Sequence, residues 1–183
     1  MAYTGLKYMV AAKLDESAAE DAYTGGTVIG RSISANVTVE SAEGSLFSED
    51  ELEAYITKVT GASITIGTSD LKQTVRAFLL GHTLTGSLLK YKNTDIAPYV
   101  GHGFYGEATT GEGVSYIAVW LYKVRFKDPV IESETKNDSI SFKTPSIAGK
   151  AIYNRTGELL DLNRFETESE AVAWLNGLAG ITE

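Results

Sequence analysis

Gly113-Val-Ser-Tyr-Ile-Ala-Val-Trp-Leu-Tyr-Lys-Val-Arg-Phe126 is a stretch dominated by β-branched and aromatic side chains. Split at a period of two, one face is apolar throughout and consists of Val114, Tyr116, Ala118, Trp120, Tyr122, Val124 and Phe126. The other face, from Ser115 to Arg125, is apolar only at its middle. This alternation predicts a β-strand whose centre is covered on both sides. Because most strands end by ~10 residues, we expect this one to hold a core and also to extend towards a neighbouring subunit.

A second alternating segment follows this strand. We expect a bend at Asp128-Pro129, after which residues 139–145 read Ser-Ile-Ser-Phe-Lys-Thr-Pro, with Ile140 and Phe142 on one face. Pro145 has no N–H to donate, so a strand here should end at that residue or lie at a sheet edge.

Shorter strands and two helices are predicted elsewhere. Their patterns indicate strands over 5–12, 27–40 (a pair or one bent strand), 62–67, 83–91 and 149–154, and loops over 13–26, 41–54 and 93–112. Apolar stripes indicate one helix over 69–81, capped by Ser69 or Asp70 and ended by Gly81, and another from a Thr167/Glu170 capping box to Gly180. About eight strands with short connections predict one mainly-β (α+β) domain over 1–183, an antiparallel β-sandwich or barrel flanked by one or two helices.

Composition narrows the class of protein. The 183 residues carry 16 basic and 24 acidic side chains, a formal net charge of −8, and no cysteine. A net acidic chain disfavours tight binding to nucleic-acid phosphates. Without cysteine, neither a disulfide nor a thiolate metal site can form. The apolar runs are far shorter than the ~20 residues of a membrane helix, and the first residues lack a signal-peptide pattern, so we expect folding in the cytosol.

The segment from Ser41 to Ala54 interrupts the strand pattern. Between residues 40 and 53 there are six acids and no base, namely Glu40, Glu43, Glu49, Asp50, Glu51 and Glu53. A like-charged segment of this kind is usually solvated, as a loop, a mobile hairpin or a short helix. The large apolar residues Leu46 and Phe47 in its middle support another interpretation, an interaction arm anchored by these two side chains.

No catalytic or cofactor-binding pattern stands out. Gly101-His-Gly-Phe-Tyr-Gly106 matches G-x-G-x-x-G, but no helical stripe follows it, so we interpret it as a glycine-rich hairpin rather than a dinucleotide site. The two histidines, His82 and His102, are too few by themselves for the three or four ligands of a zinc site. We therefore expect no enzymatic activity, no cofactor and no metal.

Several segments together carry a resemblance to a known family. They are Gly5-Leu-Lys-Tyr-Met-Val-Ala-Ala12, Ile29-Gly-Arg-Ser-Ile-Ser-Ala-Asn-Val-Thr-Val39, Ser45-Leu-Phe-Ser-Glu-Asp50, Leu79-Leu-Gly-His82, Trp120-Leu-Tyr-Lys-Val-Arg-Phe126, Ile140-Ser-Phe-Lys-Thr-Pro145 and Ile147-Ala-Gly149. In their order and spacing, these segments resemble the major tail protein family, the tail-tube subunits of long-tailed bacteriophages and prophages. The resemblance covers nearly the whole chain but not the region from Arg164 onward.

The resemblance implies a structural role in the virion. Members of this family form rings, commonly hexameric, that stack into a hollow tube assembled in the bacterial host cytoplasm. It implies self-association, contacts with other tail proteins (tape measure, initiator and terminator), and passage of DNA through the lumen without specific binding. A long loop of the family reaches the adjacent ring and corresponds by position to residues 41–60. We therefore expect inter-subunit contacts from Leu46, Phe47, Glu49, Asp50, Glu51 and Glu53.

Two other classes of function compete with this interpretation. Tyr99, Phe104 and Tyr105 could form a stacking platform in a β-sandwich module that binds carbohydrate or another ligand. Alternatively, a β-barrel enzyme could use His82 or His102 in its active site.

Overall fold

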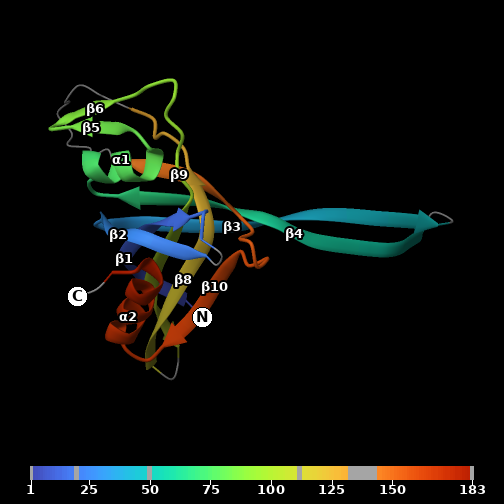
Figure 1. Cartoon of the computed structure of the whole chain (residues 1–183). Coiled ribbons are helices and arrows are strands. Elements are labelled where there is room, and N and C mark those ends of the chain that lie inside the picture. Colours follow the sequence, from blue (N-terminus) through green and yellow to red (C-terminus); the bar gives the residue numbers. More distant parts are fainter. Residues whose placement is uncertain (1, 19–20, 49–50, 111–112, 132–143, 182–183) are drawn as a thin grey trace, which may run out of the picture.

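The computed structural model describes residues 2–18, 21–48, 51–110, 113–131 and 144–181. The strands in these residues are β1 (Ala2–Asp15), β2 (Ala22–Gly30), β3 (Ser32–Ser48), β4 (Glu51–Thr68), β5 (Thr83–Thr85), β6 (Leu88–Lys90), β7 (Val100–Thr110), β8 (Gly113–Phe126), β9 (Ser146–Ile152) and β10 (Leu160–Phe165). The helices are α1 (Gln73–Leu80) and α2 (Glu168–Ala179). The predicted fold class is confirmed, because the structure is mostly antiparallel β, consistent with a sandwich, with two flanking helices (Figure 1).

Strand β8 is the element that joins the two halves of the main sheet. The strand order is β2-β1-β7-β8-β9-β4-β3, with all pairs antiparallel. The first part of β8, from Tyr116 to Leu121, also pairs with β10, whereas its last part, from Lys123 to Phe126, pairs with β9. The predicted strand over 113–126 is thus confirmed, and its length serves both halves of the fold.

The two faces of β8 exchange partway along the strand. The pairing with β7 shifts between Val100↔Val124 and His102↔Leu121, which marks a β-bulge. A bulge reverses the in–out alternation of a strand. Trp120 therefore packs under α2, while Val124 packs in the core between the two halves of the sheet. The prediction of one unbroken apolar face from Val114 to Phe126 was wrong for this reason.

Two apolar clusters hold the body together. The larger lies between the two halves of the sheet and includes Met9 and Leu121 from one half and Ile64 from the other, with Leu79 of α1 packed against them. The smaller cluster lies between the sheet and α2, around Trp120. Burying each such side chain contributes on the order of 1.5–3 kcal/mol, so this double core accounts for most of the stability of the fold.

The glycine-rich segment 93–112 contains a core strand rather than only the predicted loop. β7 occupies Val100–Thr110 and pairs with both β1 and β8. A Cβ at Gly103 would lie 2.6 Å from Leu175 of α2 and 2.6 Å from Trp120. Glycine is therefore required because α2 and Trp120 approach the backbone closely, not because the chain turns there.

Two other predicted segments were also wrong, and one strand was not predicted. The loop expected over 13–26 is mostly strand, since β1 and β2 pair as far as Asp15↔Ala22. The strand expected over 83–91 is a hairpin, β5–β6, which turns at Gly86 with a positive φ of 61°. β10 was not predicted at all; it carries the polar residues Asp161, Asn163 and Arg164, and only its first and last residues are partly buried.

The predicted ends of the two helices are confirmed only in part. α1 begins later than expected, because the Ser69 N–H still donates to the Arg31 carbonyl (3.1 Å), and neither Ser69 nor Asp70 caps it. Gly81 ends α1 in the left-handed conformation, as predicted. The Thr167/Glu170 capping box of α2 is present. The strand predicted over 139–145 falls almost entirely outside the described residues, and the predicted strand over 149–154 corresponds to β9.

Candidate functional site

The β3–β4 hairpin projects from the body as a long two-stranded arm (Figure 1). β4 pairs with β9 only between Ala62 and Gly67, so the part of the hairpin beyond these residues has no third strand in the described chain. We call residues 41–48 and 51–60 the arm. Of the alternatives named for residues 41–54, the loop was therefore wrong and the hairpin is present, because cross-strand pairing continues to Ser48↔Glu51.

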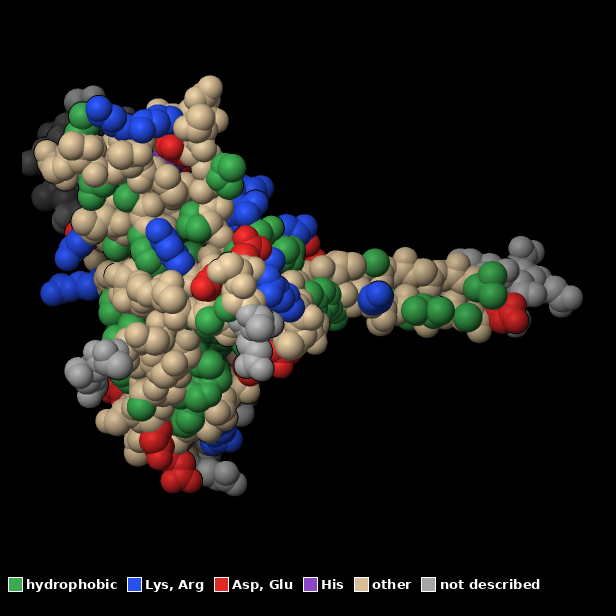
Figure 2. Space-filling view, in the orientation of Figure 1, with side chains coloured by type: hydrophobic (Ala, Val, Ile, Leu, Met, Phe, Trp, Pro, Cys, Tyr) green, Lys and Arg blue, Asp and Glu red, His purple; other side chains and the backbone are tan. Residues whose placement is uncertain are grey.

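One face of the arm is apolar and open to solvent. Gly44 pairs with Ile56 and Leu46 pairs with Ala54, and directly paired residues share a face of the ribbon. Leu46 is 57% exposed and Ile56 is 70% exposed. The small partners Gly44 and Ala54 leave these two large side chains uncovered, and Figure 2 shows hydrophobic side chains along the arm. We call these four residues the apolar face of the arm.

Four of the predicted contact residues lie in the arm by their backbones, namely Leu46, Phe47, Glu51 and Glu53. Leu46 and Glu53 are exposed on it. Phe47 and Glu51 lie in β3 and β4 by their backbones, but their side chains are outside what the structure describes, as are Glu49 and Asp50 entirely. The structure thus brings the described members of the set together on one protruding element, while their contacts with another subunit stay a prediction.

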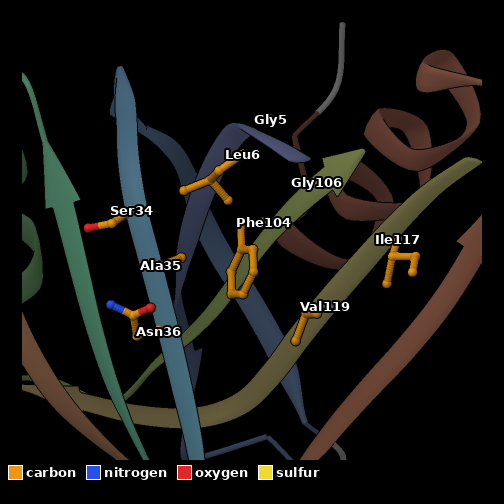
Figure 3. A pocket seen from close by; sticks show the side chains of 9 residues that line it. All are labelled: Gly5, Leu6, Ser34, Ala35, Asn36, Phe104, Gly106, Ile117 and Val119. Carbon is orange, nitrogen blue, oxygen red and sulfur yellow. The ribbon is translucent and has the colours of Figure 1, made fainter. Parts of the chain in front are cut away.

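A groove of about 280 Å³ lies between β3 on one half of the sheet and β1, β7 and β8 on the other half (Figure 3). Leu6, Ala35, Phe104 and Val119 give it an apolar lining. Its floor is made by the same side chains that close the main core at this end. No polar constellation converges in it, so its form alone indicates no chemistry.

His82 organises a second exposed region, which we call the lobe and which comprises α1, β5, β6 and the loop to residue 98. The Nδ1–H of His82 donates to Asp95 Oδ2 (2.8 Å), and its Nε2–H donates to Asp128 Oδ1 (2.8 Å). The ring also packs on Tyr91, with centroids 3.9 Å apart. Because a carboxylate can only accept, both bonds require the doubly protonated imidazolium. Burial lowers the pKa of His82, but the two aspartates outweigh it and raise the pKa above its ordinary value.

His102 has the opposite environment. Its side chain is fully buried in the main core, between the rings of Phe104 and Phe126, with centroids 6.0 and 5.7 Å away. Within the described residues, neither ring nitrogen has a hydrogen-bond partner of normal geometry. Burial lowers the pKa of His102 to about 4, and the nearby backbone of Val10 offsets this only in part. The two histidines are therefore separate: His82 is covered within the lobe and bonded to two aspartates, and His102 is neutral in the main core.

The three aromatic residues considered for a ligand platform do not form one. Tyr105 is buried under α2 and donates a hydrogen bond to Glu168. Phe104 points from the opposite face of β7 towards the main core. The Tyr99 ring is covered by Lys123 (4.4 Å) and Arg125 (3.8 Å). Because these side chains point in different directions, a shared stacking surface would require the core to open.

Among the described residues, neither a metal site nor a membrane-spanning helix is found. No group of three or more histidine, cysteine, aspartate or glutamate side chains lies together there in a way that could hold a metal ion. Neither described helix is long and apolar enough to cross a membrane. Comparison with protein-family models and with curated protein sequences finds no match for this chain.

The sequence did not single out the exposed apolar residues of the lobe and of the segment that follows β8. These are Leu88, Tyr91, Ile96, Val130 and Ile131, which come from three segments of the chain. Two of these segments are joined through His82, which contacts Tyr91 and Asp95 on one side and Asp128, just after β8, on the other. The available signal was weak, because no periodic pattern links residues in separate irregular segments.

Proposed function

We propose that this protein is a structural subunit that assembles with copies of itself, and specifically a tail-tube subunit of a long-tailed phage or prophage. In this proposal it forms stacked rings, commonly hexameric, that enclose a channel for the genome. It has no enzymatic role and meets other tail proteins at the ends of the tube. The virion tail is then its final location, after assembly in the host cytoplasm.

The observation that carries the proposal is the uncovered apolar face of the arm. A two-stranded hairpin is marginally stable in water when nothing packs against it. Leu46 and Ile56 would each contribute about 1.5–3 kcal/mol if fully buried, yet both are exposed in the single chain. Exposed apolar surface on a protruding strand pair is typical of a contact with another chain.

Two further features favour a tube in particular. The resemblance described from the sequence supplies the family, and its long inter-ring loop corresponds by position to the arm. The net charge of −8 suits a channel through which DNA slides, because acidic side chains repel phosphates. Within the described residues, β2 and β3 end the strand order and pair with no further strand, so their outer edges can pair with neighbouring subunits.

Shortening the arm tests the proposal. Ala42 and Lys58 are direct cross-strand partners, so residues 43–57 can be replaced by Asn-Gly, a two-residue turn suited to a hairpin. We expect the shortened protein to keep the wild-type unfolding transition and to remain monomeric, while the wild-type protein forms rings or tubes of uniform width. Sedimentation velocity and negative-stain electron microscopy over a concentration series measure this.

A pair of point variants separates the two faces of the arm. Leu46→Ser with Ile56→Ser removes the apolar face, while Ser45→Ala with Thr57→Ala alters the opposite face of the same ribbon. Assembly should be lost in the first variant and retained in the second. Normal tubes from the shortened protein would show that the arm is not the assembling element.

A further inference from the structure

We propose that a polar pocket at the C-terminal end of α2 binds an organic cation, whose ammonium or guanidinium group donates hydrogen bonds to the pocket wall. The pocket has a volume of about 510 Å³ and lies between the start of β2, the turn that follows β9 and the last turn of α2. This volume is within the range of small-molecule sites in proteins. The inference does not rest on the proposed function, and α2 belongs to the region that the family resemblance does not cover.

The wall of the pocket is acidic. Asp21 and Glu158 line it, and none of the described residues that line it is basic. The guanidinium of the neighbouring Arg155 donates to the backbone carbonyls of Glu16 and Ala18. The last turn of α2 carries no basic residue and contributes the partial negative charge of a helix C-terminus. The charges around this pocket therefore favour a cation.

Glu158 is held as a fixed carboxylate. Its Oε2 accepts hydrogen bonds from Asn154 Nδ2 (2.9 Å) and Thr156 Oγ1 (2.6 Å), and its backbone N–H donates to Asn154 Oδ1 (2.6 Å). The Thr156 and Asn154 side chains lower the pKa of Glu158 below its ordinary value, so Glu158 is charged at neutral pH. Within the described part of the chain, its Oε1 accepts no hydrogen bond and is left for a ligand.

Two tyrosines complete the wall and can only accept hydrogen bonds from a ligand. The Tyr23 hydroxyl donates to the Tyr122 carbonyl oxygen (2.8 Å), and the Tyr122 hydroxyl donates to Asp161 Oδ2 (2.5 Å). Each hydroxyl has a single hydrogen, so only its lone pairs remain. Burial and the nearby carboxylates of Asp21 and Glu158 raise the pKa of Tyr23, so its hydroxyl stays protonated beside these acids.

Asp21 carries the least satisfied acceptor of the wall. Its Oδ2 is shielded from solvent and has no hydrogen-bond partner among the described residues. An unpaired buried acceptor is destabilising, and most such atoms in folded proteins are paired. Because Asp21 as a whole is only half-buried, a turn of its carboxylate brings this oxygen to a donor in the pocket.

The balance of donors and acceptors selects the class of ligand. The hydroxyl hydrogens of Tyr23, Tyr122 and Thr156 and the side-chain amide of Asn154 are all directed at acceptors of the protein. Carbohydrate hydroxyls both donate and accept, so a sugar site needs donors that this wall has already used. Ammonium and guanidinium groups carry only donors and a positive charge, and so match the wall in both respects.

An NMR titration of dilute, monomeric protein tests the site. The probe is butylguanidinium chloride, with sodium chloride at equal concentration as the control for ionic strength and 1-butanol as the control for apolar binding. We expect the backbone amides of the lining residues Thr156, Gly177 and Gly180 to shift and saturate with the probe, with a dissociation constant on the order of 1 mM. The same amides should stay unchanged in both controls.

Variants tie the binding to the wall. Glu158→Gln and Asp21→Asn each remove one negative charge at nearly constant shape, and each should weaken binding at least about tenfold. A Cβ at Gly177 meets no atom within 4 Å, so Gly177→Leu is accommodated by the fold and should obstruct the pocket and abolish binding. Glu166→Gln, which removes an exposed charge outside this pocket, is the matched control and should leave binding unchanged. Thermal unfolding establishes that each variant is folded.

The outcomes decide both the site and the source of its ligand. Equal shifts with sodium chloride or 1-butanol, or binding that survives both Gly177→Leu and the two charge variants, would overturn the assignment. Among cations that do bind, tighter binding of butane-1,4-diamine identifies a free amine, whereas tighter binding of an end-blocked Gly-Arg-Gly peptide identifies a basic side chain of another protein. Because every titration uses the monomer, the result is independent of whether this protein assembles.

Discussion

The two ends of the β3–β4 hairpin are built from the same two strands but have opposite surroundings. Near the body, Ile64 of β4 is 1% exposed, packed between the halves of the sheet and supported by β9. In the arm, Ile56 of the same strand is 70% exposed and faces only solvent. Antiparallel pairing runs from Ser32↔Thr68 to Ser48↔Glu51, with a register shift between Glu40 and Ser41 where the arm begins. What differs is the packing partner of the hairpin. The body covers the inner end, and we propose that another subunit covers the arm.

The largest expected difference comes from replacing isoleucine by alanine in the body and in the arm. Ile64→Ala removes buried methyl groups and leaves a cavity, so we expect a loss of about 2–5 kcal/mol in the free energy of unfolding. Ile56→Ala should change it by less than about 0.5 kcal/mol, because the side chain is already in water. Urea unfolding of dilute protein measures both. Equal losses would mean that the arm packs on its own body in solution.

Acidification should weaken the body through His102. Its pKa falls from an ordinary 6.5 to about 4 on folding, so the unfolded chain binds the proton more readily. The folded state is then fully stabilised above pH 6.5 and loses about 3 kcal/mol as the pH falls from 6.5 to 4. The check is the free energy of unfolding against pH, in which His102→Leu should flatten this part of the curve. An unchanged slope in that variant would contradict the assignment.

Glycine substitutions sharpen the comparison further. Gly103→Ala in β7 would place a methyl group against Trp120 and Leu175, so we expect a cost of about 1–3 kcal/mol. A Cβ at Gly44 in the arm meets no atom within 4 Å, and Gly44→Ala should be close to neutral. Thermal unfolding of the two variants, measured side by side, decides whether the arm is as open as the structure shows.

The smallest expected effect concerns the lobe. Because the folded-state pKa of His82 is raised, its contribution is complete below pH 6.5 and is lost as the pH rises through that folded-state value. Two-dimensional NMR should show His82 titrating above the ordinary range and His102 well below it. His82→Gln should remove the charged contacts to Asp95 and Asp128 and so destabilise the lobe more than the main core. A lobe unaffected by this change would argue against the histidine as its organiser.

Periodic sequence patterns predicted the features that depend on one strand or one helix alone. The strand over 113–126, the left-handed end of α1 at Gly81 and the capping box of α2 were all predicted from local patterns. Local patterns could not reveal the bulge in β8, which comes from pairing with two different partners. Nor could they distinguish a glycine at a turn from Gly103, which is small because α2 lies against it.

The candidate site was predictable in sequence position but not in form. The acids and the pair Leu46 and Phe47 marked the arm as an interaction element, but their charge favoured a loop, since strands seldom carry so many acids. The hairpin continues outward from residues 35–40 and 61–66, which pair within the body, past a register shift between Glu40 and Ser41. The join between the loop at Asp95 and the segment at Asp128 was beyond the sequence, because these residues are far apart in the chain and meet only at His82.

The most direct measurement of the central claim is amide hydrogen exchange along β3 and β4, in dilute monomer and in the assembled state. If the outer hairpin depends on a neighbour, amides of residues 54–58 exchange rapidly in the monomer while those of residues 62–66 are strongly protected. On assembly, the outer amides should become protected as well. Outer amides that are as protected in the dilute monomer as those near the body, and unchanged on assembly, would contradict the account.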